Sequence, residues 1–293
     1  MPLRSLRVAA CAALACAQLF LSGCSTGQLV ARGASPLIDY GMEAMNRETD
    51  PELARESMPA NLKMIEALLL ADPSNNAYRI QAAMGFYGYA LGFVEATNPD
   101  RAVALYLRAR DHALAALEHA GLPQADLGGD LAHLDAALGK LDRHAVPALF
   151  WAASAWAKCI ELQLDDPARL DELPRVEHMM RRVLALDETY YYGGAHLFFG
   201  VYYGARAPMF GGDYARAARH FDRAAAISHG RMLFVDVYRA RYLLRQVGDR
   251  KAFHEVLRHV LDVLACTDPD LNLANALARK EAAALLAKEE ELF

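Results

Sequence analysis

The feature that most constrains this chain is a repeated spacing: a small residue, a large residue four positions on, and another small residue three positions after that. It occurs in residues 102–109 as Ala-x3-Tyr-x2-Ala, in residues 176–183 as Val-x3-Met-x2-Val and in residues 217–224 as Ala-x3-Phe-x2-Ala, with a fainter copy in residues 61–68. Steps of four and three follow one face of an α-helix. No stretch alternates long enough to predict a strand, so the sequence predicts an all-α fold.

This spacing matches the second helix of a tetratricopeptide repeat (TPR), where small residues lie at a tight helix crossing and an aromatic fills the groove between repeats. Insertions such as residues 205–212 make the repeats irregular. We therefore expect irregular TPR-like helical-hairpin repeats in one compact superhelical domain. Helices are expected at residues 51–71, 77–95, 102–119, 131–141, 144–164, 190–203, 214–227, 232–247, 251–263 and 271–292.

The stretch of residues 187–213 concentrates aromatics, glycines and one histidine. Steps of four, three and four predict that four of its residues share one helix face: Tyr192, His196, Phe199 and Tyr203. The glycines at 193, 200 and 204 indicate close approach of another backbone or of a ligand, because each costs a helix about 1 kcal/mol relative to alanine. Asp213 is expected to cap the next helix.

The helix expected at residues 144–164 is apolar on all sides, which predicts a central position. Trp151, either Ser154 or Ala155, and Lys158 share one of its faces, whereas Trp156, Cys159 and Ile160 lie towards another.

The N-terminus reads as an export signal. Residues 1–23 have a basic start and an apolar run too short to span a bilayer, and they end in Leu-Ser-Gly before Cys24. This resembles the lipobox of bacterial lipoproteins, in which the cysteine is lipidated; the alternative is an ordinary secretory signal. We expect a signal peptide (1–23), a lipidated tether (24–35) and an all-helical domain (36–293). Because Ser25 follows the cysteine, the resemblance favours the outer membrane, facing the periplasm.

Charge and cysteine content narrow the partners. Without the signal, 29 basic residues stand against 36 acidic ones, and no basic block remains, so nucleic acid is not an expected partner. Cys159 and Cys266 remain besides Cys24. Both lie in apolar helical patterns, where buried thiols are the usual state, although the periplasm would permit a bridge between them.

Motifs of catalysis are weak. In His254-Glu255-x3-His259 the histidines stand five residues apart, about 140° around a helix, and cannot share a ligand face as in HExxH. No Walker loop, GxGxxG or GxSxG motif is present. We expect no enzyme activity, no catalytic residue, no metal and no cofactor.

Candidates for a ligand pocket come from the aromatic stretch and the central helix. His196 fits either a buried core residue or a pocket residue, and Arg206 fits either an exposed loop or a partner for an organic anion. Six residues are the candidates for lining a pocket or pore: Trp151, Trp156, Tyr192, His196, Tyr203 and Arg206.

The lipobox, the TPR-like spacing and three blocks together resemble the TatT family, the T component associated with TRAP transporters. The blocks are PALFWAASAWAKCI, LPRVEHMMRRVLALDETYYYGGAHLFFGVYYGARAPMFGGD and YARAARHFDRAAAIS. The resemblance implies an all-helical lipoprotein around a central pore or groove, a TRAP solute-binding protein as partner, and a small hydrophobic or carboxylated ligand that is held or passed. It also implies a homo-oligomer such as a trimer.

Two rival hypotheses remain at this point. A TPR scaffold for envelope assembly would have an interior filled by its own side chains. A hydrolase or metalloenzyme would need a cluster of His, Asp or Glu with ligand geometry.

Overall fold

The computed structural model describes residues 26–263 and 268–293, and all of its regular structure is helical. The all-α prediction is therefore confirmed for the described residues. Cys24, Cys266 and the expected signal peptide lie outside them. Helices along the first half of the chain are α2 (Thr26–Gly33), α3 (Ser35–Asn46), α4 (Pro51–Ala71), α5 (Asn76–Tyr89), the π-helix η1 (Ala90–Val94), α6 (Pro99–His119), α7 (Gln124–Leu127), α8 (Leu131–Gly139), the 3-10 turn η2 (Arg143–Ala145) and α9 (Val146–Glu161).

The second half begins with two short to medium helices and ends in an acidic one. Its elements are α10 (Pro167–Leu170), α11 (Leu173–Leu186), α12 (Tyr190–Gly204), the 3-10 turn η3 (Pro208–Phe210), α13 (Tyr214–Ser228), α14 (Phe234–Arg239), the π-helix η4 (Ala240–Leu244), α15 (Arg245–Val247), α16 (Arg250–Asp262), the 3-10 turn η5 (Pro269–Leu271), α17 (Asn272–Ala287) and α18 (Glu289–Leu292).

Helix starts follow the capping chemistry of the sequence. The side chains of Asp50, Asn98 and Asp213 each accept a hydrogen bond from a backbone N–H of the first turn. Proline follows Asp50 and Asn98 directly, where its missing N–H would have no partner in any case. The expected cap at Asp213 is thus confirmed.

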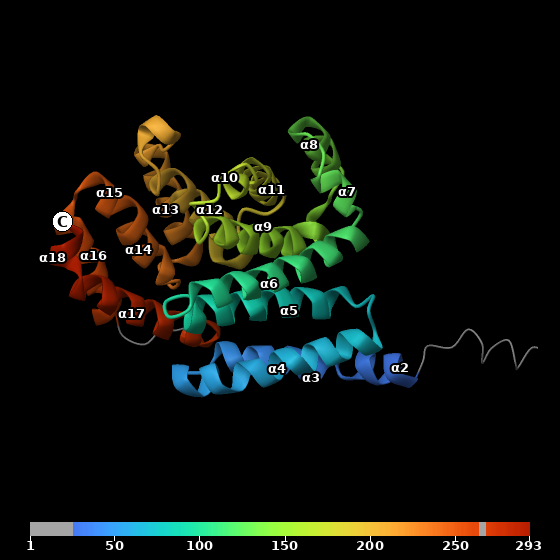
Figure 1. The fold of residues 1–293 in the computed structure, drawn as a ribbon. Coiled ribbons are helices and arrows are strands. Elements are labelled where there is room, and N and C mark those ends of the chain that lie inside the picture. Colours follow the sequence, from blue (N-terminus) through green and yellow to red (C-terminus); the bar gives the residue numbers. More distant parts are fainter. Residues whose placement is uncertain (1–25, 264–267) are drawn as a thin grey trace, which may run out of the picture.

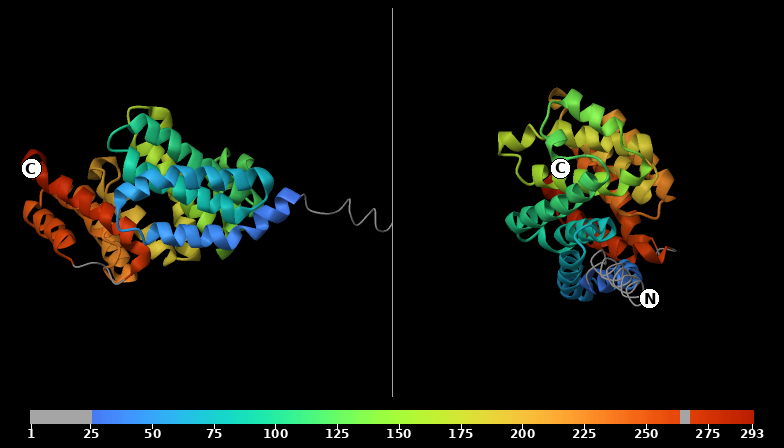
Figure 2. Two further views of the ribbon diagram at one scale, coloured as in Figure 1. Left: turned by 90° about the horizontal axis from the view of Figure 1, so that it is seen from below. Right: turned by 90° about the vertical axis from the view of Figure 1, so that its right-hand side faces the viewer.

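Helices close in sequence pack on one another, from α4 on α5 through α6 and α9 to α11, α12 and α13 (Figure 1). The C-terminal helices α14 to α18 lie at the end of the molecule opposite α2 (Figure 2). Helix α17 then returns against α3 and α4, so the first and last parts of the described chain meet. Arg47 closes this contact by donating to Asp270 at 2.7 Å and by accepting from Asn272 through its carbonyl oxygen.

The repeated spacing marks interior residues. All three key residues in 102–109, 176–183 and 217–224 are fully buried. Of the three corresponding residues in the fainter copy at 61–68, only Ile65 is buried. The burial supports the helical periodicity, while the detailed TPR geometry stays a prediction.

The first described segment is helical and packs on the rest of the protein. Residues 26–33 were expected to belong to a tether, but they form α2 and pack on α4. Ala31 is fully buried and its carbonyl accepts a hydrogen bond from the Tyr78 hydroxyl, and Arg32 pairs with the buried Asp72 at 3.1 Å. Residues distant in the sequence therefore hold α2 in place, while the bounds of the lipidated tether stay a prediction.

Close helix packing gives the first testable prediction. A Cβ on Gly204 would lie 2.8 Å from the carbonyl oxygen of Tyr242, whereas a Cβ on the helical Gly139 would meet nothing within 4 Å. Gly204→Ala should therefore lower the free energy of unfolding by about 2 kcal/mol and the melting temperature by about 4–8 °C. Gly139→Ala is the control and should be neutral or stabilise by about 0.5 kcal/mol. Equal melting temperatures for the two variants in a calorimetric scan would contradict this packing.

Candidate functional site

A cavity of about 740 Å³, partly open to solvent, lies between α3, α5, α9, α12, α14 and α17. Its volume is in the range of about 300–1,000 Å³ that is usual for small-molecule sites. Most of its wall is apolar. The aromatic residues in the wall are Tyr87, Phe93, Phe150, Trp151, Tyr191, Tyr192, Phe198, Tyr202, Phe234, Tyr238 and Tyr242.

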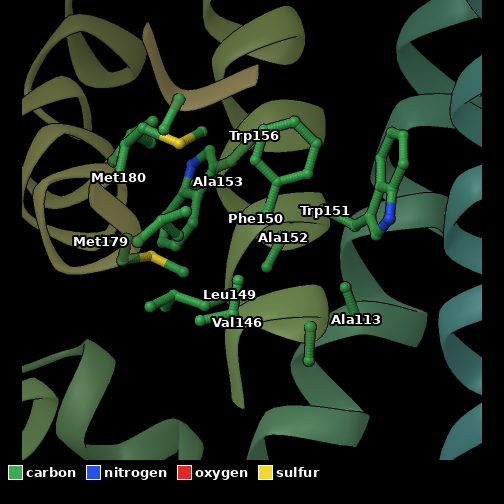
Figure 3. Packing of buried hydrophobic residues seen from close by; sticks show 14 of the residues in the cluster. Ala113, Val146, Leu149, Phe150, Trp151, Ala152, Ala153, Trp156, Met179 and Met180 are labelled. Carbon is green, nitrogen blue, oxygen red and sulfur yellow. The ribbon is translucent and has the colours of Figure 1, made fainter. Parts of the chain in front are cut away.

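Helix α9 supplies a polar stripe to this wall. Trp151, Ser154, Lys158 and Glu161 follow one another at steps of three, four and three residues, so they share one face, and all four line the cavity. The other face of α9 packs in the main hydrophobic core. Figure 3 shows Trp151 and Trp156 leaving the helix in opposite directions, with Trp156 on the side of Met179 and Met180.

Lys158 is the buried cation of the stripe. Its Nζ lies 2.8 Å from Glu95 Oε1 and 2.7 Å from Glu161 Oε2. Burial alone would favour the neutral amine, but the two carboxylates together raise the pKa of Lys158, so the ammonium form persists. Burial likewise opposes ionisation of Glu161, yet Lys158 and the hydroxyl of Tyr242 hold the pKa of this carboxyl below its usual range.

Two π-helical turns deliver the partners of this ion cluster. Glu95 follows η1 directly, and its carboxylate also accepts from the Tyr106 hydroxyl. Tyr242 and Arg241 lie within η4, where Tyr242 donates to Glu161 and Arg241 pairs with Glu281 at 2.9 Å. A π-turn inserts an extra residue per turn and re-aims side chains, which is why such turns occur often at functional sites.

The start of α12 is strained. Tyr191, Tyr192 and Gly193 have φ values of 47°, 58° and 78°, in the left-handed region. For the two tyrosines this conformation costs of order 1–3 kcal/mol each and must be held by its surroundings. Tyr191 packs edge-on against Trp151, with ring centroids 4.7 Å apart, and also contacts Phe150. The segment thereby places two aromatic rings in the cavity wall.

This strain corrects the expected helix face. The regular part of α12 begins only after Gly193, so Tyr192 does not share a face with His196, Phe199 and Tyr203. The glycine expectation holds at Gly204, which the backbone of Tyr242 approaches closely.

Three of the six pocket candidates lie in the cavity wall, and three do not. Trp151, Tyr192 and Arg206 line it, whereas Trp156, His196 and Tyr203 are absent from its wall. The indole N–H of Trp156 donates to Glu172 at 2.6 Å on the far side of α9.

His196 belongs to a separate polar cluster. Its Nδ1 lies 2.9 Å from Nδ1 of His220 and its Nε2 lies 3.1 Å from Glu188, which also pairs with Arg223. Tyr203 stacks on His220 with ring centroids 5.9 Å apart. His196 was expected to be either a buried core residue or a pocket residue. Its contacts with His220 and Glu188, and its absence from the cavity wall, favour the first alternative.

Arg206 lies at the end of α12 with its guanidinium carbon 4.0 Å from the ring centroid of Tyr202. Its Nε donates to the carbonyl oxygen of Tyr202 at 3.1 Å. It forms no ion pair with the residues that the structure describes, so its charge is available to a ligand.

Sequence reasoning missed Ser154, Glu161 and the tyrosines from α5 and η4 as cavity residues. The signal for the first two was present, because polar residues at helical spacing interrupt an otherwise apolar helix. The tyrosines carried no such signal, since aromatic residues at helical spacing are ordinary core residues.

Three further observations concern metal-binding groups, membrane-spanning helices and cysteines among the described residues. The described residues contain no group of three or more His, Cys, Asp or Glu side chains placed to hold a metal ion. None of their helices has the length and apolar character needed to cross a membrane. Cys159 is a buried thiol, and burial raises its pKa to about 12.

This chain is similar to a known protein family and to a protein of another organism. The sequence model of the family described as TRAP transporter T-component matches residues 47–293. An uncharacterized protein of Treponema pallidum (strain Nichols) is 26% identical over 262 residues, which covers 84% of this chain and 81% of the relative.

The histidine pair gives a prediction for stability against pH. Burial first, then the charges of His196, Arg216 and Arg219, lower the pKa of His220 to about 4 from 6.5. The unfolded chain therefore binds a proton more readily, so this contribution to stability is complete above pH 6.5 and is lost as the pH falls towards 4.

When the pH falls from 7.5 to 5, the free energy of unfolding of His220→Gln should fall by about 1–2 kcal/mol less than that of the wild type, because the variant lacks the titrating imidazole. Solvent screening of the partly buried site keeps the difference this small. Urea unfolding at both pH values measures this. His119→Gln, at an exposed histidine, is the control and should keep the wild-type pH slope. A wild-type slope in His220→Gln as well would refute the assignment.

Proposed function

Because the chain belongs to the TRAP transporter T-component family, we propose that it is a non-enzymatic, transport-associated lipoprotein of the cell envelope. Cys24 carries the lipid that anchors it, in the outer membrane, and the helical domain faces the periplasm. There it associates with the solute-binding protein of a TRAP transporter and assembles as a homo-oligomer such as a trimer. Its cavity holds or passes a small, hydrophobic or carboxylated ligand.

The cavity is the observation that supports the proposed binding of a small ligand. A protein that served only as a scaffold would be expected to fill its interior with its own side chains, as most cores do. Here about 740 Å³ remains between the helices, inside a mainly apolar and aromatic wall. This combination favours a ligand with an apolar body over the scaffold alternative.

Arg206 supports a carboxylate on that ligand. It lines the cavity, it stacks on Tyr202, and none of the described carboxylates pairs with it. A guanidinium group held in this way presents its remaining N–H donors to a carboxylate in a forked geometry.

The test uses the chain from Ser25 onward, which contains all of the packed helices described above. Calorimetry would measure its binding to the cognate TRAP solute-binding protein, with and without dodecanoate as the anionic apolar probe. We expect saturable binding of the partner and heat of dodecanoate binding to the chain. Absence of both would leave the scaffold alternative.

Substitution of Arg206 should distinguish dodecanoate binding in the cavity from unspecific attraction to surface charges. Arg206→Ala is expected to weaken dodecanoate binding about tenfold or more, because a charge-assisted hydrogen bond is lost. Arg245→Ala is the matched control, since Arg245 is exposed and outside the cavity wall. His196→Ala should bind as the wild type does. Equal losses at Arg206 and Arg245 would indicate unspecific charge attraction instead of a site.

A further inference from the structure

Ser154 stands out among the helical serines of the protein. The hydroxyls of Ser57 and Ser228 donate to carbonyl oxygens of the preceding turn, at 2.8 Å and 3.2 Å. Ser154 lies in the middle of α9, yet its hydroxyl makes no hydrogen bond with any of the described residues, and the side chain lines the cavity. A helical serine normally satisfies itself within its own helix or in water. The Ser154 hydroxyl in this mainly apolar wall is therefore available to form a hydrogen bond with a ligand in the cavity.

Lys158 lies one turn further along the same face. Its ammonium group has three N–H donors, of which Glu95 and Glu161 take two. Lys158 also lines the cavity, one helical turn after Ser154, so both residues belong to the same wall. Glu161 follows in the stripe with 28% of its side chain exposed, and it supplies acceptor capacity beside the two donors.

The charge of this cluster decides which group it can accept. One ammonium faces two carboxylates, so Lys158, Glu95 and Glu161 together carry a net charge of about −1 in a low-dielectric wall. A second carboxylate from a ligand would be repelled there. An uncharged oxygen, such as a ketone or hydroxyl, can accept from Ser154 and Lys158 without that penalty.

We propose that Ser154 and Lys158, backed by Glu161, form a subsite that selects an uncharged oxygen function within the apolar body of the ligand. The ligand class is thereby an amphipathic molecule with a ketone or hydroxyl group on its chain. This inference rests on the proposed ligand-holding function, and it assigns to the wall of α9 a role distinct from that of Arg206. The stripe discriminates by chemistry at a position where a purely apolar wall would select by shape alone.

The test compares dodecanoate with a set of oxododecanoates that carry one ketone at successive carbons. Displacement of the neutral fluorescent probe N-phenyl-1-naphthylamine from the chain that begins at Ser25 reports binding. We expect at least one ketone position to bind about fivefold more tightly than dodecanoate, which corresponds to one net hydrogen bond. No probe uptake at all would overturn both the ligand-holding function and the subsite. Uptake without any preference among the ketones would overturn the subsite alone.

Ser154→Ala should abolish this preference, so that the oxododecanoates and dodecanoate bind this variant with similar affinity, because the donating hydroxyl is removed. Ser57→Ala is the matched control, since Ser57 lies outside the cavity wall, and it should keep the preference. Retention of the full preference in Ser154→Ala would refute the role of the hydroxyl.

A second variant addresses the charge. A carboxyl group placed at the carbon of the preferred ketone should weaken binding to the wild type, and Glu161→Gln should narrow that difference about tenfold by removing one negative charge. Glutamine keeps the shape of the side chain and one acceptor oxygen for Lys158, while its amide N–H group can donate to the oxygen of Tyr242. An unchanged difference in Glu161→Gln would contradict the electrostatic part of the proposal.

Discussion

The buried ammonium group of Lys158 is the constraint on which the centre of this structure depends. Removing a charge from water is expensive, and such a group persists in a protein interior only when it is paired and hydrogen-bonded. Lys158 obtains Glu161 from its own helix and Glu95 from the end of η1. Tyr242 of η4 adds its hydroxyl to Glu161. Two segments that are distant in sequence, η1 and η4, are therefore held to α9 by one requirement.

That requirement also accounts for the position of the two π-turns. Each interrupts a helix beside the cavity, and each carries or immediately precedes a residue that completes the ion cluster. A regular α-helix would present a different residue at those points, because every later side chain would be rotated by about 100°. The contact between Arg47 and Asp270 then joins the two ends of the helical arrangement. The cavity is thus enclosed by polar contacts at a few points, while apolar helix packing provides the bulk of the stability.

The sequence predicted those features that depend on local chemistry. The spacing around Tyr106 and Phe221 identified buried helix faces, and Asp213 identified a helix start. Features that depend on distant partners could not be predicted. Nothing near Tyr192 in the sequence indicates a left-handed backbone, because packing on residues of other helices holds that conformation. Similarly, the apolar surroundings of His196 gave no sign of His220, which is 24 positions away and meets it only in the folded chain.

The two tryptophans of α9 show why pocket residues were harder to identify than core residues. Trp151 and Trp156 are both buried, and both stand in an apolar pattern, so hydropathy treats them alike. They differ in what lies beyond them: the cavity beside Trp151, and Met179, Met180 and Glu172 around Trp156 (Figure 3). A helix face that borders an apolar cavity resembles one that packs on protein, because both consist mainly of apolar side chains. The two differ only where the cavity face carries polar side chains that can contact a ligand. The polar residues Ser154, Lys158 and Glu161, at one helical spacing, are therefore the part of α9 that distinguishes the cavity face from the core face.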